Sequence, residues 1–388
     1  MVQLNRLHIG IFGKMNAGKS SLVNVLTGQQ TSVVSDVPGT TTDPVRKTIE
    51  LLGIGPVVLI DTAGIDDKSA LGEKRMERTE EVLDQVDLAI LVMAGPVQEA
   101  DQQLMQECQV RNIPYFCVYN KSDLSFQKPD DAPYPFISFS CKTPDNELLL
   151  TTIKKYLPQS SAASEGILDG YVRPGDEVVL VIPIDASAPE GRLILPQVQT
   201  IRNLLDIGAV AVCLKDTELA AYLKNHTPKL VVTDSQAFNQ VSKIVPVAMP
   251  LTSFSILFSR LKGDFNAFLK GTPTISQLKD GDKILMLESC SHTVNKCDDI
   301  GRVKIPALLQ KFTGKKLQFT MISNLDPLPT DLPSYKLAVQ CGGCMVTRRQ
   351  ILRRLIKLQE AGVPVSNYGM TLAYCNGIFE RVTEMFNK

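Results

Sequence analysis

The chain has 388 residues, more than one ordinary hydrophobic core accommodates, and this length predicts two or three domains. Hydrophobic residues make up 44% and charged residues 21% of the sequence, as in soluble globular proteins, and no apolar run approaches the ~18 residues that a membrane span requires. Lys plus Arg and Asp plus Glu number 41 each, so the excess of positive charge that is typical of nucleic-acid binders is absent.

The N-terminus and the cysteines indicate the cellular compartment. The first residues, MVQLNRLHIGIFGK, enter a strand without the charged, apolar and small-residue sections of a signal peptide, so we expect a cytoplasmic protein. Nine irregularly spaced cysteines, an odd number, favour structural, metal-binding or catalytic roles over a set of disulfides. Cys108, Cys117 and Cys213 lie in apolar segments and are expected in the core.

The first predicted element is an apolar strand that ends in a glycine-rich loop and continues as a helix. The loop reads Gly13-x-x-x-x-Gly18-Lys19-Ser20. In such a loop the backbone amides and the helix N-terminus point at phosphates, Lys19 reaches the terminal phosphates, and the Ser20 hydroxyl ligates magnesium. The nucleotide-binding residues expected here are Asn16, Ala17, Gly18, Lys19, Ser20 and Ser21.

Three later strand ends indicate which nucleotide is bound. The strand VVLID ends at Asp61, a carboxylate for the magnesium shell, and is followed by Gly64, whose amide can sense the terminal phosphate. The next motif is NKSD, in which Asp123 can accept from the ring nitrogen and the exocyclic amine of guanine; adenine offers no matching donors. The residues expected to contact guanine are Asn120, Lys121, Asp123, Ser140, Cys141 and Lys142.

In this order the motifs resemble the small GTPase family, and PGTTTD at residues 38–43 resembles switch I of the group that contains the tRNA-modification GTPase. The resemblance implies nucleotide contacts by Thr40 and Thr41, with Thr41 also a magnesium ligand, and potassium at Asn16 in place of an arginine finger. Carbonyls around Ser35 and Val37 would be the other potassium ligands; the alternative is that Asn16 is a turn residue without an ion. The expected enzyme is a slow, potassium-stimulated GTPase whose catalytic residues are Lys19, Thr41 and Gly64.

The middle of the chain predicts a second α/β domain. We expect a GTPase domain at 1–160, a linker at 161–175, an α/β domain at 176–262 and a last domain at 263–388. Within the α/β domain, apolar runs at 177–184, 209–215, 229–234 and 245–249 predict strands of a small parallel sheet, with helices between them. Because this sheet lacks a nucleotide-binding loop, we expect it to serve homodimerisation, with a higher oligomer as a further option. Residues 251–271 predict one long amphipathic helix.

The last domain contains a cysteine pair, Cys341-Gly-Gly-Cys344, between an apolar strand and a basic helical segment at residues 348–362. This segment is expected to present its arginines to solvent, and the alternative is a basic docking face for an acidic partner. Cys290-Ser-His292 follows another apolar strand. Three interpretations fit this spacing. One is structural zinc on Cys290, His292, Cys341 and Cys344; the second is a redox pair at Cys341 and Cys344; the third is an iron-sulfur cluster on three thiolates.

The order of a potassium-type GTPase domain, an α/β domain, Cys-x-His and Cys-Gly-Gly-Cys resembles the FeFe-hydrogenase maturation GTPases over essentially the whole chain. This resemblance implies a 4Fe-4S cluster on Cys290, Cys341 and Cys344. Many relatives have a histidine where this chain has Gln340, so the fourth ligand stays open between His292, Cys297, a carboxylate and exchangeable water. The implied fold is α/β, with a P-loop GTPase domain, a small parallel α/β dimerisation domain and a C-terminal cluster-binding domain.

The function implied by this resemblance is a GTP-hydrolysing scaffold or carrier. It would assemble or deliver the diiron subcluster precursor of the hydrogenase, its cargo, and its partners would be two radical-SAM maturases and the apo-hydrogenase. The alternative is an RNA-modification or ribosome-assembly GTPase with structural zinc, which the zero net charge and the lack of a recognisable RNA module disfavour. A third candidate is a GTP-controlled redox switch at Cys341 and Cys344.

Overall fold

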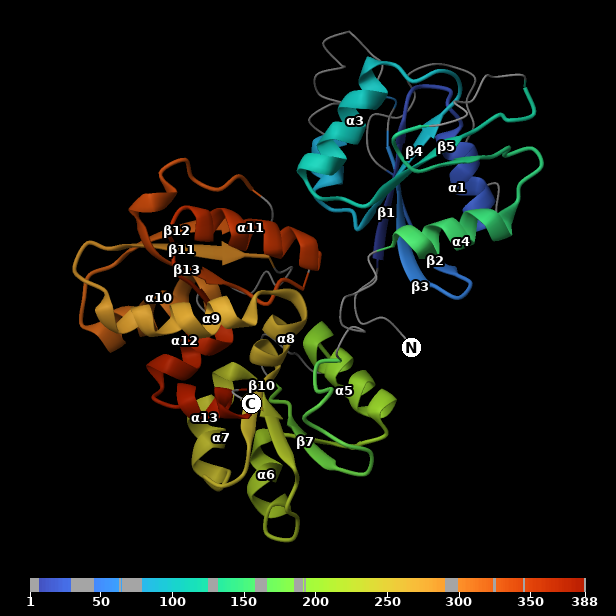
Figure 1. Cartoon of the computed structure of the whole chain (residues 1–388). Helices are drawn as coiled ribbons and strands as arrows, with labels where there is room; N and C mark the ends of the chain where they lie inside the picture. The colour runs from blue at the N-terminus through green and yellow to red at the C-terminus, as the bar shows by residue number, and fades with distance from the viewer. Residues whose placement is uncertain are drawn as a thin grey trace. The chain divides into compact units, whose positions relative to one another are not determined.

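The structure is a computed structural model in which the chain forms two compact units, residues 1–164 and 165–388 (Figure 1). The residues that it describes are 7–28, 45–62, 64, 79–124, 132–157, 166–184, 191, 193–289, 299–323, 326–344 and 346–386. The predicted α/β fold class is confirmed, whereas the predicted boundaries at 160, 176 and 263 stay predictions. Within the described residues no helix is long and apolar enough to cross a bilayer.

The first unit is a six-stranded sheet in the order β2-β3-β1-β4-β5-β6, parallel except for the antiparallel edge strand β2. Its strands are β1 (Leu7–Gly13), β2 (Val45–Leu51), β3 (Gly55–Asp61), β4 (Leu88–Met93), β5 (Tyr115–Tyr119) and β6 (Phe136–Ser138). Its helices include α1 (Lys19–Thr27), α3 (Glu99–Val110) and α4 (Asn146–Tyr156). Because β1, β3, β4, β5 and β6 run in one direction, their carboxyl ends meet at one edge of the sheet.

Strand alternation decides which helix covers which face of this sheet. Ile9 and Ile11 of β1 are fully buried in a core with residues of α1 and α4, while Phe12 is buried in a second core with residues of α3. Figure 1 shows α1 and α4 on one side of the sheet and α3 on the other. The central strand β4 is buried along its whole length, as expected for a parallel sheet covered on both faces.

The second unit contains two four-stranded parallel sheets, in the orders β10-β9-β7-β8 and β12-β11-β13-β14. The strands are β7 (Glu177–Val181), β8 (Val210–Leu214), β9 (Leu230–Thr233), β10 (Leu251–Ser253), β11 (Lys283–Glu288), β12 (Gln318–Ser323), β13 (Tyr335–Gln340) and β14 (Val365–Asn367). The α-helices are α5 (Leu195–Ile207), α6 (Asp216–Tyr222), α7 (Phe238–Ile244), α8 (Phe254–Lys262), α9 (Phe265–Gly271), α10 (Ile305–Thr313), α11 (Arg348–Glu360), α12 (Tyr368–Cys375) and α13 (Phe379–Thr383).

Two predictions for the middle of the chain are wrong in detail. The fourth strand is β10, not residues 245–249. The single long helix predicted over 251–271 is a strand followed by two helices, because Ser253 caps α8 by accepting from the Ile256 N–H and Asp264 caps α9 by accepting from the Ala267 N–H. Gly263 stands between the helices with extended backbone, which ends α8. The chain therefore turns where the hydrophobic periodicity continues.

The two sheets of the second unit share one hydrophobic core. Val179 and Val231 of the first sheet belong to the same buried cluster as Leu285 and Ala338 of the second, with Phe268 of α9 also in it. Helix α8 follows β10 directly and lies between the two sheets (Figure 1). The opposite face of the β11 and β13 sheet packs on α10 and α12 in a separate cluster. The two sheets are thus parts of one folded body.

Strand β8 is an edge of its sheet, which corrects one prediction about the cysteines. Cys108 and Cys117 are fully buried, as predicted, but Cys213 on β8 is exposed because no further strand or helix covers it among the described residues. Val210 at the start of β8 is also exposed. An uncovered edge strand presents unpaired backbone groups to any strand that approaches.

Candidate functional site

The glycine-rich loop lies at the carboxyl end of β1 and leads into the N-terminus of α1. Gly18 caps α1 with a φ of 97°, a left-handed conformation that glycine adopts without strain. Lys19 is 8% exposed, and its Nζ donates to Gly13 O at 2.9 Å and to Lys14 O at 2.7 Å. The ammonium is therefore held by the loop's own carbonyls, at the place where a bound phosphate would meet it.

The magnesium side of the site is formed by Ser20 and Asp61. Ser20 Oγ donates to Asp61 Oδ2 at 2.9 Å, while Asp61 Oδ1 is buried and has no hydrogen-bond partner among the described residues. Burial raises the pKa of Asp61, and the Ser20 hydroxyl and the Lys19 charge partly offset that rise. An unpaired carboxylate oxygen beside a serine hydroxyl suits the hard oxygen ligation of Mg²⁺, so these residues fit the ion.

The chain after β3 approaches the phosphate loop closely. A Cβ added to Gly64 would lie 2.6 Å from the Met15 backbone nitrogen, so only glycine fits there. Asn16 has a φ of 59°, the left-handed conformation of a tight loop. The predicted switch residues Thr40 and Thr41, and the predicted potassium-ligating carbonyls around Ser35 and Val37, lie outside the described residues.

The predicted guanine residues converge at the carboxyl ends of β5 and β6. Asn120 Nδ2 donates to Ala17 O at 3.0 Å, and Asn120 Oδ1 accepts from the Cys141 N–H at 3.2 Å. Asn120 therefore ties the phosphate loop to the loop after β6. Lys121 follows with a φ of 60°.

Asp123 is held in place by two neighbours. Its Oδ1 accepts from Ser140 Oγ at 2.9 Å, and its Oδ2 lies 3.2 Å from Lys142 Nζ. The Ser140 hydrogen bond, with a contribution from Lys142, holds the pKa of the Asp123 carboxyl below its usual range. The predicted guanine acceptor is thus kept ionised.

One supporting contact was not predicted from the sequence. Lys14 Nζ forms an ion pair with Asp101 Oδ2 at 2.8 Å, and the Asp101 side chain is only 5% exposed. Asp101 also accepts from the Gln98 N–H at the start of α3. This pair joins the phosphate loop to α3. The signal that could have indicated it was an acidic residue in the first turn of this helix on its buried face, at helical spacing from Leu104 and Cys108.

The cysteine pair follows β13, at the carboxyl edge of the second unit's second sheet. Strand β13 pairs with β11, Leu287 opposite Gln340, and the Cys341 N–H donates to Leu287 O at 2.9 Å. Cys341 Sγ accepts from the Ser289 N–H at 2.9 Å and from the Gly343 N–H at 3.4 Å. Cys341 is therefore next to the residue that precedes Cys290 in the sequence.

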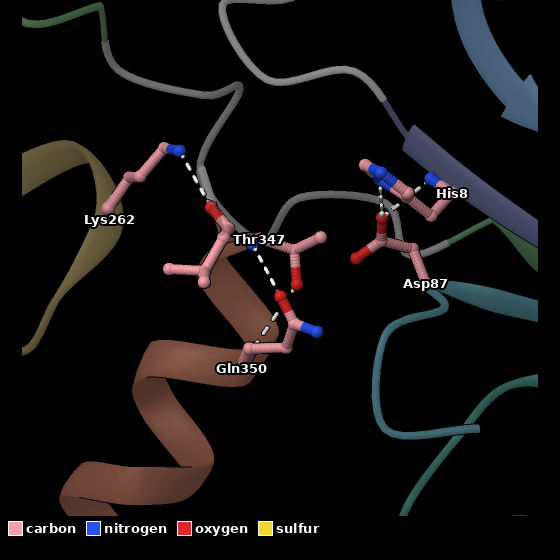
Figure 2. Close-up of polar contacts among 6 residues, drawn as sticks. His8, Asp87, Lys262, Thr347 and Gln350 are labelled. Carbon is pink, nitrogen blue, oxygen red and sulfur yellow. Dashed lines mark hydrogen bonds and ion pairs between the residues drawn. The ribbon is translucent and has the colours of Figure 1, made fainter. Parts of the chain in front are cut away.

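Cys344 and its loop are held by α8 and α11. Burial and the neighbouring Cys341 raise the pKa of the Cys344 thiol to about 11, with Lys262 opposing the rise. Gly343 has a φ of 67° and packs against Ile351 of α11. Thr347 caps α11 by accepting from the Gln350 N–H at 3.2 Å, and Gln350 Oε1 accepts in return from the Thr347 N–H at 2.8 Å (Figure 2).

The donor set at this edge fits a thiolate-bound metal centre. Two cysteines flank two glycines in a loop where N–H groups already point at Cys341 Sγ, as they do at cluster sulfurs. Cys290, His292 and Cys297 lie outside the described residues. Among the described residues, no three His, Cys, Asp or Glu side chains form a metal-binding group. Gln340 is buried, and its Oε1 has no partner in the described part of the chain.

Comparison with protein families assigns each part of the chain. Residues 8–121 match the description "50S ribosome-binding GTPase", residues 167–263 match "Hydrogen maturase F dimerization domain", and residues 266–385 match "Hydrogen maturase F tetramerization domain". The first unit is therefore a GTPase domain. The two hydrogen maturase F matches together cover more than half of the chain.

Curated relatives share the GTPase character. The tRNA modification GTPase MnmE of Nitrosomonas europaea is 40% identical over 126 residues, which are 32% of this chain and 28% of the relative. GTPase Der of Kosmotoga olearia is 40% identical over 131 residues, 32% of this chain and 29% of the relative. MnmE of Chromobacterium violaceum is 34% identical over 186 residues, 45% of this chain and 41% of the relative. The chain thus spans less than half the length of each of these relatives. With its GTPase domain followed by the dimerization and tetramerization domains, the chain belongs to the hydrogen maturase F family of GTPases.

Proposed function

We propose that this chain is a GTP-hydrolysing scaffold that carries a 4Fe-4S cluster and assembles or delivers the diiron precursor to an apo FeFe-hydrogenase. The observation that carries the proposal is the hydrogen bond from the Ser289 N–H to Cys341 Sγ at the carboxyl edge of the sheet. This contact supports a common site for Cys290 and the Cys341–Cys344 pair in a chain of the hydrogen maturase F family.

In the GTPase domain the proposed roles of Lys19, Ser20, Asp61 and Asp123 are supported by their contacts, and those of Thr41, Gly64 and Asn16 by the sequence motifs. Lys19 would exchange its two carbonyl partners for phosphate oxygens, and Ser20 and Asp61 would hold Mg²⁺. Asp123 would accept from guanine. Thr41 would complete the magnesium shell and Gly64 would bind the terminal phosphate. The apolar side chain of Ile65 cannot form a hydrogen bond that orients the attacking water, so catalysis must rely on other groups. A potassium ion at Asn16 would contribute by offsetting the negative charge that develops between the phosphates in the transition state.

In the second unit, Cys290, Cys341 and Cys344 would hold the cluster as thiolates. When bound, the cluster supplies one-electron chemistry and an iron with an exchangeable position. The chain's own contribution is the rigid loop between Cys341 and Cys344 and the N–H groups of Ser289 and Gly343, which stabilise negative charge on sulfur. An exchangeable fourth position suits a carrier, because a closed site could not accept and release cargo.

The nucleotide would time this exchange. GTP orders switch segments through its terminal phosphate and Mg²⁺, and hydrolysis releases them. We expect this change to alter contacts with two radical-SAM maturases, which supply the precursor, and with the apo-hydrogenase, which receives it.

Assembly of the chain would involve the exposed face of α5 and the free edge of β8. Leu195, Val198 and Leu205 recur at helical spacing on α5 and are each at least 40% exposed. Val210 on the neighbouring edge strand is 51% exposed. These exposed apolar side chains share α5 with the Arg202–Asp206 ion pair and lie beside an edge strand in the part that matches a dimerization domain, which supports a homodimer through this face.

Guanine recognition is tested with Asp123→Asn. We expect the Kd for GDP to rise on the order of a hundredfold, because a charged acceptor of two hydrogen bonds becomes an amide that accepts one. Titration with fluorescent GDP measures the effect, and Glu147→Gln on α4 is the matched exposed control. Xanthosine diphosphate, which carries an oxygen in place of the guanine amine, should bind the variant better than the wild type. An unchanged GDP affinity would contradict the assignment of Asp123.

Potassium dependence is tested by measuring GTP hydrolysis in potassium and in sodium at equal ionic strength. We expect hydrolysis to be roughly tenfold or more faster in potassium, because the ion stabilises charge in the transition state. Asn16→Ala should remove the difference while nucleotide binding is retained. Equal rates in the two salts would reject the ion site.

The cluster is tested by low-temperature EPR of protein that is reconstituted with iron and sulfide without oxygen and then reduced with dithionite. We expect a fast-relaxing S = 1/2 signal that is lost in Cys290→Ala, Cys341→Ala and Cys344→Ala. Cys213→Ala, at an exposed cysteine of the other sheet, is the control that should keep it. A colourless protein with one zinc per chain would overturn the proposal and favour the RNA-related alternative.

The dimer face is tested with the double change Leu205→Glu and Val210→Glu. Charges placed in an apolar interface should shift the chain toward a smaller species in light scattering after gel filtration. Val247→Glu, at a valine that is 85% exposed and precedes β10, the opposite edge strand of the same sheet, should leave the mass unchanged. If the double variant keeps the wild-type mass, the chain assembles through another surface.

A further inference from the structure

A buried lysine reaches into the cysteine loop from a different structural element. Lys262 is the last residue of α8 and is 6% exposed. Its Nζ donates to Gly343 O at 2.9 Å and to Val346 O at 2.8 Å. Figure 2 shows the Lys262 side chain reaching the segment that leads into Thr347. Both acceptors are backbone carbonyls of the segment that contains Cys344. Lys262 therefore connects α8 to the predicted cluster-binding loop.

A second residue of α8 supports this contact. Phe258, one helical turn before Lys262, has its ring centroid 5.3 Å from Lys262 Nζ. A Cβ added to Gly342 would lie 3.8 Å from the Phe258 ring, so the ring also packs near the loop. The aromatic ring stabilises the ammonium and excludes water from it. The cation is thus fixed in one position.

The charge of Lys262 has no carboxylate partner in the described part of the chain. Its contacts are carbonyls and a ring, and the groups whose negative charge would attract it are Cys344 and Cys341 in their thiolate forms. Removing an ammonium from water is unfavourable, and neutral carbonyls do not cancel its charge. Such a burial is favourable when the loop that it holds carries negative charge.

A second buried cation lies near the same cysteine. Arg354 of α11 is 7% exposed; its Nη2 donates to Asp326 O at 3.1 Å, and its Nη1 has no partner among the described residues. Its charge interacts with Cys341 as well as with Asp326. The helix that contains it was expected to keep its arginines in solvent. Positive charge is therefore concentrated around the cysteine pair from both α8 and α11.

We propose that Lys262 is a positioning residue of the cluster site, which holds the Cys341–Cys344 loop in its binding conformation and compensates the negative charge of the thiolate-bound cluster. The inference rests on the proposed function, because it requires the 4Fe-4S cluster. Three thiolates around an oxidised core leave about one net negative charge, and reduction adds another. A buried cation beside the loop favours the reduced form and raises the reduction potential.

The experiment compares Lys262→Met, Lys262→Arg and wild-type protein after cluster reconstitution. The reduction potential is measured by EPR-monitored redox titration, and bound iron is counted per chain. We expect a more negative potential and several-fold faster loss of iron to a chelator in Lys262→Met, with both properties restored toward wild type in Lys262→Arg. Lys357→Met, which removes an exposed cation from α11, is the matched control and should leave both unchanged.

The outcomes separate this inference from the proposed function. Wild-type protein without a cluster would overturn both. A cluster whose potential and rate of iron loss are the same in Lys262→Met and Lys357→Met would overturn this inference alone. If Lys262→Met retains no cluster, retention in Lys262→Arg supports the role of charge, whereas loss in both variants would show a purely structural contact and overturn the inference.

Discussion

The pairing of β11 with β13 is the constraint on which the second unit's chemistry depends. Residues 289 and 341 are far apart in the sequence, yet two parallel strands in register end side by side. The N–H of one segment then reaches the sulfur of the other. The same rule acts in the first unit, where parallel strands bring the phosphate loop, Asp61 and Asn120 to one edge. Both sites are therefore products of strand direction.

Much of the fold was predictable because its signals are local. Hydrophobic periodicity and glycine positions predict the phosphate loop, the strands around it and the helices of the middle domain. The nucleotide contacts proposed for Lys19, Ser20 and Asp61 follow from a motif whose geometry is set by the backbone. The predicted family is confirmed for the same reason, since its motifs occur in the expected order.

What was missed depends either on local caps within an apolar stretch or on partners distant in the sequence. The break at Gly263 was hidden because apolar residues continue on both sides of it, and only the caps at Ser253 and Asp264 reveal it. Cys213 was expected inside because its strand is apolar, but strand order decides which strand is an edge. Burial of Lys262 and Arg354 could not be read from composition, since charged residues on helices usually face water.

The core shared by the two sheets of the second unit means that the two matched family domains do not form independent folding units. Family comparison separates the chain near residue 264, between α8 and α9, yet residues on both sides of that point fill one apolar interior. A chain cut there would leave each piece with an apolar face toward water. A substitution in the core face of one sheet consequently changes the packing of the other sheet, so the two sheets are constrained to change together although sequence comparison divides them.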